Sequence, residues 1–203
     1  MFLQGKSPGS NFRCAPICPV FAALVQLVMD KLRSIIESDF SKQTIDLSND
    51  QWHRVIPNQA GWYYLETDAP LEVFLQLESP PSEYINEDGE EKKCRNYDIS
   101  SRSETLVTGL ETDGIIIDRA GTRPVYSGMA INLLNRAREH TFGHKGTAGL
   151  ALANYRELAE YTWTFRYMEN NLQYSSKKHR NIILKLGEQI WRSNNGWPIL
   201  CSS

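Results

Sequence analysis

Residues 123–140, RPVYSGMAINLLNRAREH, are the stretch from which the fold and a site can be predicted. Val125 and Tyr126 form a short apolar run that predicts a strand. Ser127-Gly128 predicts the end of that strand, because glycine permits the backbone geometry of a turn. After the glycine, apolar residues recur at helical spacing, at positions 130, 133, 134 and 137. The stretch therefore predicts a strand, a turn and a helix, in that order.

The other face of this predicted helix carries polar groups. Asn132, Arg136 and His140 recur every four residues, which places them on one face. A guanidinium and an imidazole one turn apart, beside a strand-end tyrosine, suit the binding of a phosphate. The alternative interpretation is a solvated face, the commoner setting of such a pair.

A second short motif stands upstream, where GWYYL (residues 61–65) predicts an aromatic strand with Gly61 and Tyr63 two apart. Tyr126 and Gly128 repeat that spacing, and Arg136 and His140 follow Tyr126 by ten and fourteen residues. This ordered set resembles the GIY-YIG nuclease family. The family pattern continues with a metal-binding glutamate on a later helix, and Glu188 in KLGEQIW stands where that glutamate is expected.

The resemblance implies a fold, an activity and a set of site residues. The implied fold is mixed α/β (α+β), a small antiparallel sheet flanked by helices. A tail and helical extension would occupy residues 1–59 and a GIY-YIG-like nuclease domain residues 60–203. The implied activity is hydrolysis of phosphodiester bonds in duplex DNA, with Mg²⁺ or Mn²⁺ as cofactor. The implied catalytic residues are Tyr63, Tyr126, Arg136, His140 and Glu188, with Glu188 as the metal ligand.

The chain departs from the simple form of the family between its two motif strands. In the family these strands form a hairpin, whereas 62 positions separate Tyr63 from Tyr126 here. We interpret residues 68–114 as an insertion between paired strands, since the entropic cost of a loop grows only with the logarithm of its length. The insertion is either a surface elaboration or an arm for DNA reading or dimerisation. Within it, LEVFLQL (71–77) suggests a strand.

Each proposed site residue has a role and a competing interpretation. In the family the first tyrosine is commonly assigned to activating the water, and the second to supporting the site. A phenol with a pKa near 10 is a poor base, so Tyr63 needs a positive neighbour or a proton acceptor, which Arg136 and His140 could provide. Arg136 would also bind the phosphate, and Glu188 would hold one Mg²⁺. Alternatively the tyrosines are ordinary strand residues, Glu188 is solvated, and His140 caps its helix or lies in water.

Charge is distributed unevenly along the 203 residues, whose net charge is −2. Residues 1–118 hold 10 Lys and Arg against 19 Asp and Glu, a balance of −9, whereas residues 119–203 hold 12 against 5, a balance of +7. The half with the motifs is thus basic, as a phosphate-binding half should be, although many proteins show such asymmetry without binding anything.

The candidate nucleic-acid contacts are Lys145, Lys177, Lys178 and Arg180. The last three stand with His179 at the start of a predicted helix, where positive charge opposes the helix dipole. An external phosphate would explain them, and a frayed, solvated helix start is the alternative. The glycine-rich FGHKGTAG (142–149) lacks the spacing of a P-loop, so no nucleotide site is predicted there. Asn194 and Asn195 follow Glu188 more closely than the family asparagine does, so they receive at most a minor role.

The remaining pattern predicts a helix over 19–38, irregular chain over 40–60 anchored by Trp52 and Pro57, a short helix over 150–159, and an alternating aromatic strand in YTWTFRYM (161–168). The apolar run at 15–29 is shorter than the roughly 20 residues that span a bilayer and lacks a convincing cleavage site. We therefore expect a packing helix in a cytoplasmic, intracellular protein without a membrane segment. Four scattered cysteines do not suggest a disulfide scaffold or a zinc site.

By analogy with the family, the chain most resembles a sequence-specific restriction endonuclease acting on duplex DNA. A short palindromic site would call for a homodimer, with one active site for each strand. The alternatives are a structure-specific repair or mobile-element nuclease, a non-catalytic nucleic-acid-binding domain, and a structural protein with coincidental motifs.

Overall fold

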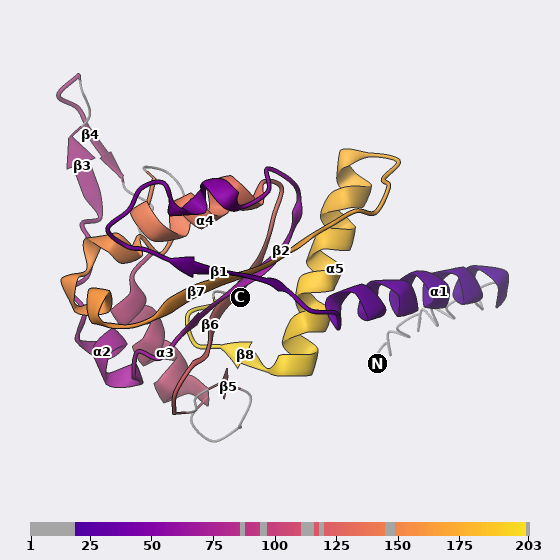
Figure 1. The fold of residues 1–203 in the computed structure, drawn as a ribbon, viewed down its shortest axis with the longest axis horizontal. Helices are drawn as coiled ribbons and strands as arrows, with labels where there is room; N and C mark the ends of the chain where they lie inside the picture. The colour runs from indigo at the N-terminus through magenta and orange to yellow at the C-terminus, as the bar shows by residue number, and fades with distance from the viewer. Residues whose placement is uncertain are drawn as a thin grey trace, which may run out of the picture.

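A computed structural model describes residues 19–85, 88–93, 97–110, 116–117, 120–144 and 149–201. Its centre is a four-stranded antiparallel sheet flanked by helices (Figure 1), which confirms the predicted mixed α/β class. In spatial order the strands are β1 (Ser41–Ile45), β7 (Trp163–Glu169), β2 (Gly61–Thr67) and β6 (Arg123–Ala130). The motif strands β2 and β6 are therefore neighbours, with β6 at one edge.

Pairing between β2 and β6 brings together residues that are far apart in the sequence. Tyr63 lies opposite Gly128, and Leu65 lies opposite Tyr126. The two motif strands are therefore paired, as expected, although residues 68–114 lie between them in the sequence. The described part of this insertion contains α2 (Leu71–Gln76), the hairpin β3 (Glu83–Ile85) and β4 (Glu91–Lys93), and α3 (Ile99–Leu110). Figure 1 shows the hairpin projecting from the body.

The strand suggested at 71–77 is wrong, because this segment forms the helix α2. Leu71, Phe74 and Leu77 recur every three residues, a spacing that gathers them on one side of a helical turn. Phe74 is fully buried there, and Pro70 occupies the N-cap position. Burial of this one side decided between helix and strand, since short apolar runs fit both.

The two faces of the sheet carry different helices. Tyr63 and Leu65 point to the face covered by α4 (Leu133–Phe142), where they share a core with Leu133 and Ala137. Trp62 points to the opposite face, where α5 (Lys177–Asn195) packs with Leu184 and other apolar residues. Tyr63 thus points to the opposite face of the sheet from its neighbours Trp62 and Tyr64.

The position of α5 on the sheet is fixed by Trp62 and Gly187. The indole Nε1 of Trp62 donates a hydrogen bond of 2.8 Å to the carbonyl oxygen of Leu184. A β-carbon on Gly187 would lie 2.3 Å from that same Nε1, so only glycine lets the helix approach this closely. This close packing determines where Glu188, the next residue, is placed.

The predicted N-terminal helix is confirmed as α1 (Pro19–Ile36). Leu32 and Ile36 near its end are buried against α5, whereas the part around Leu27, which is 66% exposed, extends away from the body (Figure 1). Among the residues that the structure describes, no helix is long and apolar enough to cross a membrane.

Two further predictions need correction. Residues 40–60 are not irregular throughout, because β1 pairs with β7 and η1 (Trp52–Val55) is a 3₁₀ turn; Trp52 is buried there, as predicted for an anchor. The helix expected over 150–159 is instead two 3₁₀ turns, η2 (Leu152–Asn154) and η3 (Arg156–Glu160).

The aromatic strand is confirmed as β7. Short strands β5 (Ile116–Ile117) and β8 (Trp197–Pro198) pair in parallel.

Candidate functional site

The strand β6 continues through Ser127 and Gly128 to Ala130, so the predicted strand end at this dipeptide is wrong. Gly128 is needed for space and not for a turn. A β-carbon at this position would lie 2.4 Å from the hydroxyl oxygen of Tyr63 on the neighbouring strand. Without a side chain at 128, the Tyr63 hydroxyl can extend over β6 toward α4.

Four of the five predicted site residues meet at this point. Nε of Arg136 donates a hydrogen bond of 2.9 Å to the Tyr63 hydroxyl, and Nη2 of Arg136 donates one of 3.4 Å to the Tyr126 hydroxyl. Nε2 of His140 lies 2.9 Å from the Tyr63 hydroxyl. The rings of Tyr126 and His140 are 4.6 Å apart, centroid to centroid. We call Tyr63, Tyr126, Arg136 and His140 the tyrosine cluster.

The hydrogen bonds of His140 determine which ring nitrogen carries the proton. The backbone N–H of Leu150 donates to Nδ1 across 3.3 Å, so Nδ1 is the unprotonated nitrogen. Burial, together with the charge of Arg136, holds the pKa of His140 well below its ordinary value, and the imidazole is neutral. Its single proton is then on Nε2 and is donated to Tyr63. In this arrangement His140 does not serve as the proton acceptor for Tyr63.

The Tyr63 hydroxyl therefore accepts two hydrogen bonds inside a buried cluster. Burial and the neighbouring Tyr126 nevertheless raise the pKa of Tyr63 well above 10, and Arg136 opposes that rise. Tyr63 is thus a neutral phenol at pH 7 in the free protein. The N–H groups of Arg136 and His140 orient the phenol oxygen. The proton of the phenol itself remains available for donation to a third group.

Arg136 is held in place by a carboxylate that the sequence patterns did not single out. Nη1 of Arg136 and Oε2 of Glu139 form an ion pair of 2.9 Å within α4. Asn132, which was expected on the same face as Arg136, is instead the N-cap residue of α4 and accepts a hydrogen bond from the backbone N–H of Asn135. Its side chain is a helix cap and not a member of the cluster.

The fifth predicted residue, Glu188, approaches from the face of the sheet that α5 covers. Its Oε1 accepts a hydrogen bond of 2.5 Å from Nη2 of Arg192. Burial raises the pKa of Glu188, and the charges of Arg192 and Arg136 oppose this. The positive charge of Arg136 therefore favours the ionised form of Glu188, although among the described residues no hydrogen bond joins Glu188 to the tyrosine cluster.

The side chains present suit a Mg²⁺ ion that is bound by one protein carboxylate, and not an ion that is surrounded by several protein ligands. Across the described residues, no group of three or more His, Cys, Asp or Glu side chains could surround an ion. Glu188 has one oxygen, Oε2, without a hydrogen-bond partner among these residues, and its side chain is 15% exposed. One carboxylate is a sufficient protein ligand for Mg²⁺ when waters and phosphate oxygens complete the shell.

The predicted nucleic-acid contacts stand at the start of α5. Lys177 and Lys178 are exposed and Arg180 is partly buried. Ser176 caps the helix by accepting from the backbone N–H of His179, so this helix start is capped. Lys145 lies outside the described residues.

Asn194 and Asn195 do not join the cluster. Asn194 donates to Oε1 of Glu37, and Asn195 donates to the carbonyl oxygen of Trp191.

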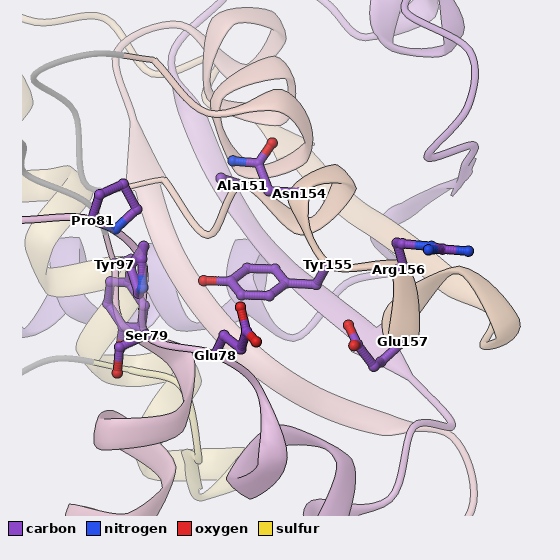
Figure 2. A pocket seen from close by; sticks show the side chains of 10 residues that line it. Glu78, Ser79, Pro81, Tyr97, Ala151, Asn154, Tyr155, Arg156 and Glu157 are labelled. Carbon is purple, nitrogen blue, oxygen red and sulfur yellow. The ribbon is translucent and has the colours of Figure 1, made fainter. Parts of the chain in front are cut away.

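A hollow of about 390 Å³ lies next to the tyrosine cluster, on the other side of the Tyr97 ring. Figure 2 shows Tyr97 on one side of it and Tyr155 pointing its hydroxyl into it, between Glu78 and Asn154. Tyr97 also packs edge-on against Tyr126, with ring centroids 6.2 Å apart. Tyr97 therefore separates this hollow from the cluster.

The comparisons with known proteins add no relative, since no protein-family model, curated protein or solved structure matches this chain.

Proposed function

We propose that this chain is a Mg²⁺-dependent endonuclease of the GIY-YIG kind that hydrolyses phosphodiester bonds in duplex DNA. The observation that carries the proposal is the contact of Arg136 with both motif tyrosines, at 2.9 Å from Tyr63 and 3.4 Å from Tyr126. These three residues come from β2, β6 and α4. A cation fixed between two hydroxyls, in a chain half of charge +7, suits an anionic substrate.

The order of the strands supports the proposal. The Tyr63 strand lies between the Tyr126 strand and the Trp163–Glu169 strand, so it is held on both sides. A site on a central strand keeps its geometry better than one on a loop. The insertion leaves this pairing intact.

In this proposal each residue of the site has its own role in the hydrolysis. Arg136 binds the phosphate and stabilises the negative charge that grows on it during attack. Tyr63 is oriented by Arg136 and His140 and holds the attacking water. The ionised form of Tyr63, a phenolate, accepts the proton of that water. Tyr126 supports the guanidinium. Glu188 would hold Mg²⁺, which polarises a phosphate oxygen and eases departure of the 3′ oxygen.

The direct test is cleavage of a long duplex DNA of varied sequence in the presence of Mg²⁺. Wild type and Glu188→Ala are compared, with Glu157→Ala as a control, since Glu157 is exposed on η3. Discrete fragments from the wild type and the control, and none from Glu188→Ala, are expected. Equal cleavage by Glu188→Ala would remove Glu188 from the mechanism, and no cleavage by any of the three would overturn the nuclease assignment.

We further propose a sequence-specific restriction enzyme that works as a homodimer. Identical ends on all fragments and a twofold-symmetric recognition site would support it. A monomer in solution that cuts branched DNA at a junction would favour a repair or mobile-element nuclease instead.

A further inference from the structure

Arg192 makes a set of buried contacts around Glu188 that the site described above does not explain. Its side chain is 8% exposed. Nη2 donates to Oε1 of Glu188 at 2.5 Å and to the carbonyl oxygen of Ser127 at 3.3 Å, while Nε donates to the Ser127 hydroxyl at 3.0 Å. The guanidinium also lies over the ring of Trp197, 4.4 Å from its centre.

These contacts join α5 to the strand of the second motif tyrosine. Ser127 stands between Tyr126 and Gly128, and since side chains alternate along a strand it points to the α5 face. One guanidinium therefore links Glu188 on α5 to Ser127, the residue that follows Tyr126 on β6. Lysine could replace the charge, but not the planar fork that holds two partners at once.

We propose that Arg192 is a positioning residue for Glu188, holding Oε1 so that Oε2 is left to a divalent cation. The proposal rests on the proposed function, which makes Glu188 the metal ligand. Carboxylates that bind metals are commonly oriented by such a hydrogen bond from outside the metal's own ligands, and its loss costs about 10–100-fold in metal affinity or activity.

A purely electrostatic role predicts the opposite sign. Arg192 is a positive charge beside the proposed cation site, so its removal by itself strengthens the binding of a divalent cation. If orientation of Glu188 dominates, removal weakens binding. The direction of the change therefore decides between positioning and simple repulsion.

The measurement is binding of Mn²⁺ alone to the full chain, followed by electron paramagnetic resonance without DNA. Arg192→Met is expected to weaken Mn²⁺ binding about 10–100-fold, and Arg192→Lys to recover only part of it. Arg166→Met is the matched control, because Arg166 forms a similar ion pair of 2.8 Å on the same face of the sheet, with Glu66 as its partner instead of Glu188. This control should leave Mn²⁺ binding unchanged.

Ser127→Ala provides a second test that does not depend on whether Arg192→Met folds. It removes one acceptor of Arg192 without opening a large cavity, and it should weaken Mn²⁺ binding less than Arg192→Met while the melting temperature stays close to wild type. Metal affinity equal to or tighter than wild type in folded Arg192→Met would overturn the positioning role. A wild type that neither binds Mn²⁺ nor cuts DNA would overturn the proposed function itself, and the inference with it.

Discussion

The hydroxyl of Tyr63 occupies the space that any side chain at position 128 would need, since a β-carbon on Gly128 would stand 2.4 Å from the phenol oxygen and 2.7 Å from the carbon that bears it. Gly128→Ala should therefore displace Tyr63 from Arg136. We expect a loss of about 1–3 kcal/mol in the free energy of unfolding, as for other overpacked sites. DNA cleavage should fall with it. Urea denaturation and cleavage rates measure the two effects, and an alanine variant with wild-type values for both would show that Tyr63 can move without cost.

Arg136→Lys should abolish most cleavage while preserving the fold. Lysine keeps the charge but cannot reach Tyr63, Tyr126 and Glu139 at once, as the guanidinium does. A loss of about 100-fold or more in the single-turnover cleavage rate is expected. Arg138→Lys, on the exposed face of the same helix, is the control and should keep wild-type activity. Comparable rates for both variants would contradict the role of Arg136.

Cleavage should accelerate with pH well into the alkaline range. Because burial and Tyr126 raise the pKa of Tyr63 well above 10, only a small fraction of the phenol is ionised at pH 7. If Tyr63 takes the proton of the attacking water, the rate should rise about tenfold for each pH unit, with no plateau below pH 9. A rate that is flat between pH 7 and 9, measured under single-turnover conditions, would rule out this role. Tyr63→Phe should be inactive throughout.

Stability should decrease as the solution is made acidic, through His140. The folded protein keeps His140 neutral because burial and Arg136 lower its pKa, whereas the unfolded chain takes up a proton below about pH 6.5. Proton uptake by the unfolded state alone lowers the free energy of unfolding, by up to about 1.4 kcal/mol for each pH unit below 6.5. The loss is therefore absent above that pH and grows below it.

Denaturation of His140→Gln at pH 7 and pH 5 provides the check. The variant should be less stable at pH 7 but should lose less between the two values than wild type does. Some loss should remain, because the pKa of His53 is also lowered, mainly by burial. An unchanged pH dependence would show that His140 is not the group responsible.

Replacing Lys177 and Lys178 together by alanine should weaken DNA binding for all sequences alike. Both are exposed at the start of α5, where they can contact phosphates without displacing a partner among the described residues. The slope of binding against salt concentration should fall by roughly one for each lost contact. Lys92→Ala on the β3–β4 hairpin, where Lys92 pairs with Glu90 at 2.7 Å, should leave the slope unchanged. A full slope in the double variant would place the DNA elsewhere.

The parts of the fold that follow periodicity could be predicted from the sequence. The helices α1 and α5 and the strand β7 were identified because their apolar residues recur at the spacing of their element. α2 was mistaken for a strand since six residues are too few to separate the two periods. β1 was missed because its residues, SKQTI, are mostly exposed at the sheet edge and carry no apolar alternation.

The site could be predicted where residues that are close together in the sequence are also close together in the structure. Arg136 and His140 are one helical turn apart, so their proximity followed from the pattern. The role of Gly128 did not follow, because it depends on what the neighbouring strand places over it. Glu139 and Arg192 could have been found by pairing acid and base at i, i+3 and i, i+4, since each forms such an ion pair with a predicted site residue.

The outer side of β6 is not left open, because the segment after α5 lies along it. The backbone N–H of Leu200 bonds to the carbonyl oxygen of Val125, and the backbone N–H of Ser127 points to the sulfur of Cys201. During synthesis on the ribosome, the strand that carries Tyr126 is made long before residue 200 exists to cover it. A nascent chain that already contains the tyrosine cluster thus still exposes an unpaired strand edge and lacks Glu188. Protection of this edge against aggregation and completion of the candidate site therefore both wait for residues 188–201.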